Sequence, residues 1–202
     1  GLLPSNAEDY PVAEFGDAIR KFASSVDRVV VGGGDGSMNA ALAELRKSGL
    51  PLVVIPLGTS NNLARNLGIP FDLPGACALV RDGALRSIDL GVVNGFPFLN
   101  VAGMGLSIEV NRTVHHRFKR YFGMLAYIAT AFRVLKKYRP FRAEIVADGE
   151  SLCLRTLQIS VCNGQHFGSG LKISHDAVID DGALDLVSIP IERWWKIPRL
   201  AN

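Results

Sequence analysis

The sequence predicts an α/β protein with two lobes: a parallel α/β lobe, then an antiparallel β lobe with an inserted helix. Strand-like and helix-like segments alternate over about the first 88 residues, which is typical of a parallel sheet covered by helices. Later apolar runs are joined by Asn94-Gly95 and by Asp148-Gly149, dipeptides typical of hairpin turns. One helical pattern, near residues 117–138, interrupts these runs. We therefore place the boundary between the lobes at residues 88 and 89.

The elements of each lobe follow from local patterns. Apolar residues at helical spacing, and glycines at the stops, predict helices in the first lobe. Short β-branched or continuous apolar runs predict strands. The first lobe is thus expected to contain helices over 12–23, 38–47, a short segment ending at 67, and 73–81, with strands over 28–31 and 51–57. The second lobe is expected to contain strands over 88–93, 96–102, 143–147, 152–162 and 184–189.

The charge of the chain is unevenly distributed. The 22 basic and 19 acidic residues give a net charge of +3, yet residues 112–142 hold nine Lys or Arg and no Asp or Glu. Aromatic and aliphatic residues between Phe118 and Leu135 make this segment a basic amphipathic helix candidate for a membrane surface. The alternative is a helix packed on the second lobe with solvated basic ends. No nucleic-acid-binding module is visible, so nucleic acid is not an expected partner.

Cysteine usage and the hydropathy pattern narrow the cellular setting. The three cysteines (Cys77, Cys153 and Cys162) form no C-x-x-C pair, so neither a disulfide framework nor a zinc site is predicted. This usage fits a reducing cytosol. No run of about 18 apolar residues suggests a membrane span. We expect a cytoplasmic protein with peripheral contact at the inner membrane surface.

The most informative stretch is Gly33-Gly34-Asp35-Gly36-Ser37, at the end of the first predicted strand. Glycine lets the backbone approach a phosphate, and N–H groups at a helix start bind anions. The stretch matches neither G-x-x-x-x-G-K-[ST] nor G-x-G-x-x-G. Asp35 would repel phosphate unless a cation lies between them. The alternative is a tight strand-to-helix turn capped by Asp35.

A second polar loop follows the next predicted strand. Gly58, Thr59 and Asn61 offer backbone, hydroxyl and amide groups that can bind phosphate oxygens or a base. The alternative is a helix N-cap at Ser60 or Asn61. Loops that leave the carboxyl ends of parallel strands meet at one edge of the sheet, where such sheets bind ligands. Two adjacent loops of this kind favour a binding site.

These motifs together resemble the diacylglycerol kinase catalytic domain family, which includes bacterial diacylglycerol kinase-like and sphingosine kinase-like lipid kinases. The resemblance covers nearly all of residues 27–189. The first motif is shared with NAD kinases, whereas the full set is specific to the lipid kinases. The segments that carry the resemblance are G-G-G-D-G-S-x-N (32–39), P-L-G-T-x-N-x-x-A-R (56–65), Ser87–Asn94, Asn163–Ile173 and Asp176–Leu186.

The resemblance implies a Rossmann-like nucleotide-binding lobe over 1–88 and a β-sandwich-like, lipid-acceptor lobe over 89–202. It implies a kinase of lipid metabolism and phospholipid biosynthesis that transfers the γ-phosphate of ATP to a diacylglycerol-like or sphingoid-like hydroxyl. Asp35 and Asp89 would serve the catalytic centre. Mg²⁺ would be held by Asp181 with backbone carbonyls of Val178 and Ala183. The implied ATP-binding residues are Gly33, Gly34, Asp35, Gly36, Ser37, Asn39, Gly58, Thr59 and Asn61.

Some features depart from the family pattern. Family members begin with a further strand, and they end with an L-D-G-E-type segment whose acidic residue is the general base; we expect both outside this chain. The chain by itself is therefore not expected to be active. Asn62 stands where Asp is frequent, and Ser37 where Thr is usual. Two alternatives stay open: an NAD kinase-like enzyme, and a nucleotide-binding regulatory domain without catalysis.

Overall fold

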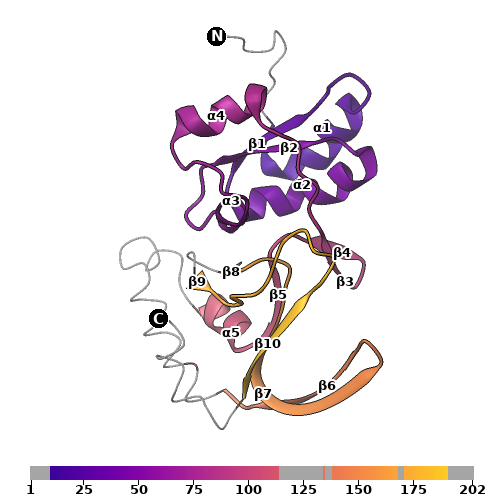
Figure 1. The fold of residues 1–202 in the computed structure, drawn as a ribbon, viewed down its shortest axis with the longest axis vertical. Coiled ribbons are helices and arrows are strands. Elements are labelled where there is room, and N and C mark those ends of the chain that lie inside the picture. The colour runs from indigo at the N-terminus through magenta and orange to yellow at the C-terminus, as the bar shows by residue number, and fades with distance from the viewer. Residues whose placement is uncertain (1–9, 114–133, 135–137, 168–170, 191–202) are drawn as a thin grey trace. The chain divides into compact units, whose positions relative to one another are not determined.

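The computed structural model describes residues 10–113, 134, 138–167 and 171–190 (Figure 1). The chain divides into two compact units, Gly1–Leu99 and Asn100–Asn202. The hairpin of β3 (Gly91–Val93) and β4 (Phe96–Phe98) thus belongs to the first unit, whereas the sequence placed the boundary before it. The cause is packing: β4 lies against a helix of the first unit, and the Phe98 ring covers Gly91 so closely that a Cβ there would lie 2.1 Å from it.

The first unit has the predicted alternation of strands and helices. After the short helix η1 (Val12–Glu14), the order is α1 (Phe15–Phe22), β1 (Val29–Gly33), α2 (Asp35–Ser48), β2 (Leu52–Pro56), α3 (Asn62–Leu67) and α4 (Leu73–Asp82). β1 and β2 pair in parallel, from Val29 opposite Leu52 to Gly33 opposite Pro56. Helix α2 packs on β1, and α4 packs on β2. The predicted parallel α/β lobe is confirmed, and both strands end at the same edge.

The core of the first unit is built from one face of α2 and the two strands. Met38, Ala41, Leu42 and Leu45 are buried at spacings of three and one, which place them on one side of a helix. They lie in one unit with the buried Val31, Val54 and Ile55 of the strands. A fully buried side chain of this size contributes about 1.5–3 kcal/mol. The position of α2, and therefore of the loop at its start, is fixed by this face.

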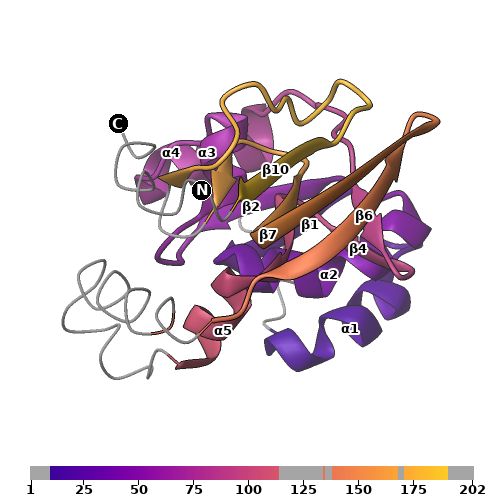
Figure 2. The same ribbon diagram turned by 90° about the horizontal axis from the view of Figure 1, so that it is seen from below.

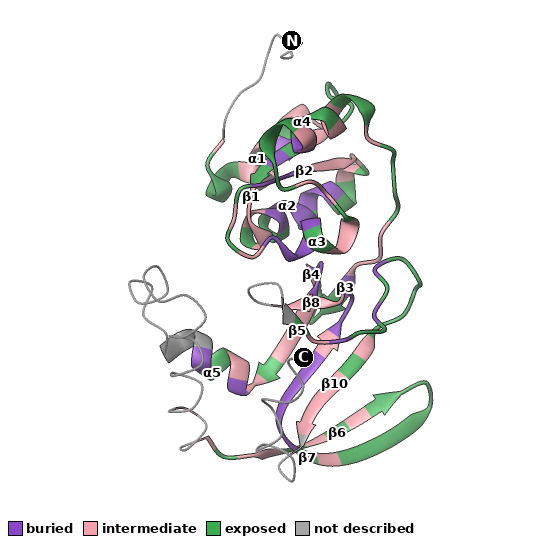
Figure 3. Cartoon of the chain, turned by 60° about the vertical axis from the view of Figure 1, so that its left-hand side comes forward, coloured by how far each residue is buried: buried purple, intermediate pink, exposed green. Residues whose placement is uncertain are grey.

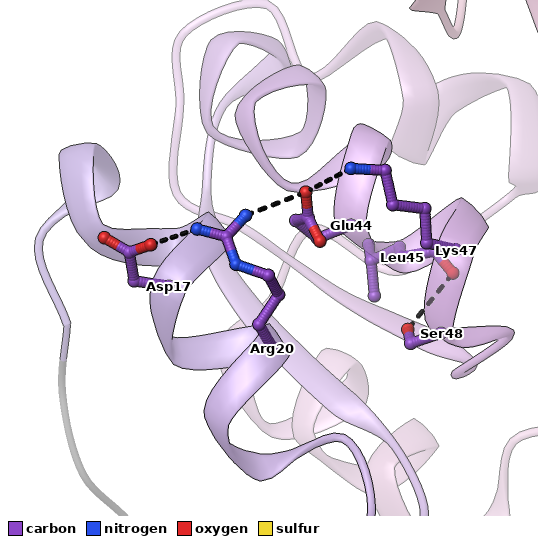
Figure 4. A network of polar contacts seen from close by, with 6 residues as sticks. All are labelled: Asp17, Arg20, Glu44, Leu45, Lys47 and Ser48. Atoms are coloured by element: carbon purple, nitrogen blue, oxygen red, sulfur yellow. Dashed lines mark hydrogen bonds and ion pairs between the residues drawn. The ribbon is translucent and has the colours of Figure 1, made fainter.

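A chain of ion pairs joins α1 to α2 (Figure 4). The Glu44 carboxylate of α2 accepts from Lys47 at 2.8 Å and from Arg20 of α1 at 2.9 Å. Arg20 also pairs with Asp17 on its own helix. The hydrogen bond from Lys47 lowers the pKa of Glu44, against the opposing effect of burial, and the positive charges of Lys47 and Arg20 lower it further. Burying this carboxylate is tolerated because two cations surround it.

The second unit is an antiparallel sheet centred on one long strand. Its elements are β5 (Val101–Gly105), α5 (Leu106–Thr113), β6 (Phe141–Ala147), β7 (Glu150–Cys162), β8 (His166–Phe167), β9 (Leu171–Lys172) and β10 (Asp185–Pro190). β6 pairs with the first half of β7, and β5 and β10 pair with its second half. The first half forms a twisted two-stranded ribbon with β6 (Figure 2). The predicted antiparallel lobe is confirmed.

One element expected in this region differs in the structure, and another lies mostly outside the described residues. The single strand expected over 96–102 is wrong: the chain breaks it into β4 and β5, and α5, which no sequence pattern predicted, follows β5 directly. The expected helix over 117–138 lies outside the described residues apart from Val134 and Tyr138. Among the residues that are described, no helix is both long enough and apolar enough to cross a bilayer.

The second half of β7 carries a buried polar face (Figure 3). Thr156, Gln158 and Ser160 are buried but hydrogen-bonded. Gln158 Oε1 accepts the N–H of Ser107 at the start of α5, at 2.8 Å. The chain can turn into α5 here because Gly105 has φ +114° and a Cβ there would lie 2.4 Å from the Leu157 carbonyl oxygen. This polar contact fixes the start of α5 together with the buried Leu106 and Val110 of the helix.

Candidate functional site

The two predicted loops lie in contact at the carboxyl ends of β1 and β2. The Leu57 N–H donates to the Gly33 carbonyl at 3.1 Å, which continues the ladder into the loops. Beyond it, a Cβ on Gly58 would lie 2.4 Å from Gly34 Cα. Real Cβ contacts are essentially never this short, so the two backbones can touch only because residue 58 is glycine. A Cβ on Gly34 would lie 3.1 Å from Gly58 Cα, which is tight as well. The loops therefore form one continuous surface.

The first loop turns directly into α2. Gly34 is the N-cap, with extended backbone (φ −96°, ψ −173°), so Asp35, Gly36 and Ser37 form the first helical turn. The predicted start at residue 38 was three residues late because a glycine N-cap has no side chain to signal it. Ser37 folds its hydroxyl back over Gly33, and the exposed Asn39 follows in the next turn.

The start of α2 suits an anion. Gly34 provides no side-chain cap, so no side chain of the N-cap covers the N–H groups of this 14-residue helix. A Cβ on Gly36 would meet no described atom within 4 Å, so the backbone there is open to approach. The positive end of the helix dipole adds to the attraction for a negative group. Phosphate is a ligand that fits these groups.

The second loop is closed by Asn61. This residue has left-handed backbone (φ 46°, ψ 49°), and its side chain makes two hydrogen bonds to Gly58: Oδ1 accepts the N–H at 2.9 Å, and Nδ2 donates to the carbonyl at 2.8 Å. Asn61 is the N-cap residue of α3, but its side chain does not cap that helix. Thr59 lies in the closed loop and is exposed.

The cap of α3 comes instead from the first loop. Asp35 Oδ2 accepts from the Asn62 N–H at 3.0 Å and from Asn62 Nδ2 at 3.2 Å, and Oδ1 accepts from the Leu63 N–H at 3.0 Å. Asn62 Oδ1 is buried and has no hydrogen-bond partner among the described residues. The structure thus brings Asp35 together with Asn62, a residue that the sequence flagged only as a departure from the family.

Two further predicted residues lie elsewhere in the chain. Asp89 is half-buried in the connection between α4 and β3, and its catalytic role stays a prediction. Asp181 is exposed in the turn before β10, and its Oδ1 accepts the N–H of Ala183 at 3.0 Å. This bond makes the Asp180-Asp181-Gly182 turn a local Asx turn.

Few oxygen ligands are available for a magnesium ion at the Asp181 turn. No group of three or more His, Cys, Asp or Glu side chains that could hold a metal occurs among the described residues. A carboxylate oxygen is a hard ligand of the kind that Mg²⁺ prefers, but Asp181 is one carboxylate and already accepts a hydrogen bond. Carbonyls of Val178 and Ala183, with water, would have to complete the shell. The magnesium site therefore stays a prediction.

The one buried thiol of the described residues is poorly suited to nucleophilic attack. Burial raises the pKa of Cys162 to about 11, and the negative charge of Asp185 adds to the effect. The reactive form of cysteine is the thiolate, which is scarce at neutral pH when the pKa is this high.

Two family models match the chain. Residues 10–93 match the diacylglycerol kinase catalytic domain, and residues 100–198 match the YegS C-terminal NAD kinase beta sandwich-like domain. A relative from Bacillus subtilis strain 168 named diacylglycerol kinase is 35% identical over 173 residues, covering 84% of this chain and 56% of the relative. A Pseudomonas fluorescens relative named "Probable lipid kinase YegS-like" is 33% identical, with 88% and 61% covered.

A solved structure is similar to this chain over both family matches. A crystal structure from Bacillus anthracis str. Sterne, of a protein provisionally named a diacylglycerol kinase, superposes with a TM-score of 0.83 at 27% identity. The superposition covers 96% of this chain and 65% of the chain in that crystal structure. The chain therefore spans somewhat under two thirds of these three proteins. Residues 10–93 belong to the diacylglycerol kinase catalytic domain family, and residues 100–198 belong to the YegS C-terminal domain family.

Proposed function

We propose that this chain is the greater part of an ATP-dependent lipid kinase, which transfers the γ-phosphate of ATP to a lipid hydroxyl. The observation that carries the proposal is the interlocked pair of loops at one sheet edge, with the open start of α2 between them. The names of the relatives from B. subtilis and P. fluorescens support the reaction class. The proposed acceptor is a lipid of the diacylglycerol or sphingoid type, as the family resemblance implies, and both types carry a hydroxyl that can take the phosphate.

The phosphates of ATP would bind the backbone N–H groups at the first turn of α2. Gly36 leaves room for them, and the Ser37 hydroxyl and Asn39 amide lie on the same helix. Thr59 would reach the nucleotide from the second loop, whereas Asn61 shapes that loop through its bonds to Gly58. These backbone groups are fixed before the ligand arrives, so they stabilise charge without reorganising.

The reaction is a direct displacement. The lipid oxygen forms a bond to the γ-phosphorus as the bond from that phosphorus to the bridging oxygen of ADP breaks, and the hydroxyl proton passes to a general base. The family resemblance places that acidic base outside this chain. ATP would enter as its magnesium complex. Asp89 is the proposed further carboxylate of the catalytic centre, and the Asp181 turn is the proposed site of a separate, structural Mg²⁺.

The second unit is the proposed acceptor domain, and the basic segment 112–142 the proposed membrane contact. Most of this segment lies outside the described residues. Its nine cations and lack of acidic residues would favour an anionic lipid surface by about 1 kcal/mol for each cation close to it.

The test uses the complete open reading frame, with magnesium, labelled ATP, and vesicles that contain diacylglycerol or a sphingoid base. Gly36→Ala is the informative variant. A methyl group there meets no described atom, and alanine is the better helix former, so the variant should be as stable as wild type or more so. The same methyl group would stand where the phosphate approaches, so the KM for ATP should rise at least tenfold.

Gly16→Ala is the matched control, because its Cβ would make only ordinary contact, at 3.5 Å from Glu44 Cγ on the opposite helix. It should leave ATP affinity unchanged. Equal ATP affinity in both variants would contradict phosphate binding at α2. Label on NAD instead of on lipid would favour the NAD kinase-like alternative, and ATP binding without any phosphorylated product would favour a regulatory domain.

A further inference from the structure

We propose that Asp35 is a positioning residue, which holds the second loop through the start of α3, and that the Asn62 amide makes this contact independent of a divalent cation. The part of this inference that concerns ATP binding by the second loop rests on the proposed function. The contact between Asp35 and α3 does not depend on that function. Its evidence is that both Asp35 oxygens accept hydrogen bonds from the first two residues of α3.

Helix α3 depends on this external cap. It has six residues, and helices so short are unstable without tertiary contacts. Its own N-cap side chain, that of Asn61, is bonded to Gly58 instead. The first two N–H groups of α3 therefore find their acceptor 27 and 28 residues away in the sequence, on Asp35. Since Asp35 belongs to the first turn of α2, the cap ties the two loops to each other.

The charge balance explains why asparagine suits position 62. The carboxylate of Asp35 can only accept hydrogen bonds when ionised, so the Asn62 side chain presents its NH₂ group, at 3.2 Å. A carboxylate at position 62 would bring two negative groups to this distance in a side chain that is only 7% exposed. Such a pair needs a proton or a cation between its members. The amide removes that need.

The same contacts argue against a direct role for Asp35 at the phosphates. Oδ2 already accepts two hydrogen bonds and Oδ1 one, so little acceptor capacity is left. The negative charge would also repel an anion bound at the neighbouring N–H groups. What Asp35 does control is the placement of residues 58–62, which carry Thr59 and touch Gly34. Loss of this carboxylate should therefore act through the second loop.

The test is a reciprocal exchange in the full-length protein: Asp35→Asn, Asn62→Asp, and the two together. Hydrogen exchange over residues 57–64 measures how firmly the second loop is held. Thermal unfolding in EDTA or in Mg²⁺ measures how the pair at positions 35 and 62 affects stability. Binding of a fluorescent ATP analogue and the turnover rate measure function. Asp35→Asn should speed exchange over 57–64 by about tenfold, as loss of a helix cap does. The same substitution should also weaken binding of the ATP analogue by a similar factor.

Asn62→Asp should unfold about 2–4 °C below the wild type in EDTA, and Mg²⁺ should remove that difference between the two proteins. Any response of the proposed Asp181 site is common to both and does not enter the comparison. The double variant keeps one carboxylate and one amide in the pair, with their places exchanged. It should unfold in EDTA at a higher midpoint than Asn62→Asp, because the two like charges are gone. It should keep the fast exchange over 57–64 that Asp35→Asn shows, because one of the two oxygens that cap α3 is now an NH₂ group. The segment 37–48 should exchange alike in all variants, because α2 is held by its own core face.

Two results would overturn the proposal. One is unchanged exchange over residues 57–64 in Asp35→Asn. The other is an Asp35→Asn variant that binds the analogue with wild-type affinity but has lost turnover, because Asp35 would then act on the reacting groups. A wild-type protein that binds no ATP analogue would instead refute the proposed function, and the exchange and unfolding measurements would still decide the role of Asp35.

Discussion

Substituting Gly58 with alanine probes the contact that joins the two loops. The new Cβ would lie 2.4 Å from Gly34 Cα, 2.7 Å from Asn61 Oδ1 and 3.0 Å from Gly34 N. Carbon atoms that are not bonded prefer about 3.5–4.0 Å, so the loops would have to separate by about 1 Å. Overpacking of this kind costs about 1–3 kcal/mol of unfolding free energy. For a chain of about 200 residues, this lowers the unfolding midpoint by roughly 2–12 °C.

The assay is thermal and urea unfolding followed by circular dichroism, with Gly36→Ala as the comparison. Gly36 belongs to the same pair of loops, but its Cβ would point into open space, and alanine there should gain up to about 1 kcal/mol. The change in unfolding free energy should therefore be destabilising for Gly58→Ala and stabilising for Gly36→Ala. If Gly58→Ala unfolds at the wild-type midpoint, the close contact of Gly34 with Gly58 does not hold the loops together, and the reasoning fails.

Three further predictions concern the rest of the fold. The lowered pKa of Glu44 means that its contribution to stability is fully present above the ordinary value of 4.5 and is lost as the pH falls through the lowered value; Glu44→Gln should therefore reduce the unfolding midpoint at pH 7, and by progressively less as the pH falls below 4.5. Iodoacetamide at pH 8 should modify the exposed Cys77 and Cys153 well before the buried Cys162, and equal rates by mass spectrometry would contradict its burial and raised pKa. Gly105→Ala should cost at least about 1–3 kcal/mol in urea unfolding, because φ is +114° and the Leu157 carbonyl stands in the way; wild-type stability would show that the turn into α5 is not tight.

Local patterns predicted most elements of this chain. The strands before both loops, the helices at 73–81 and 12–23, and the two hairpin turns came close to their observed bounds, since each depends on residues that are neighbours in sequence. The turns show why: Asn94 and Asp148 have positive φ, and each is followed by a glycine with positive φ. A backbone preference of this kind is encoded by the dipeptide itself.

The family was also visible in the sequence alone, because its motifs are short runs of glycine and polar residues at strand ends. The two family models cover the segments that carried the resemblance, apart from Asn94. The motifs identify which residues gather at the sheet edge, since parallel strands bring their exits together. They do not say what each side chain does there.

Tertiary structure decided the roles within the site. The early start of α2 depends on the conformation of Gly34, and the start of α5 depends on Gln158, which lies 51 residues from Ser107. The cap that Asp35 provides for α3 likewise joins groups far apart in sequence. Sequence alone determined the loops, because backbone preferences are local. Only the folded chain determined which loop a carboxylate serves, because hydrogen-bond partners are chosen by distance in space.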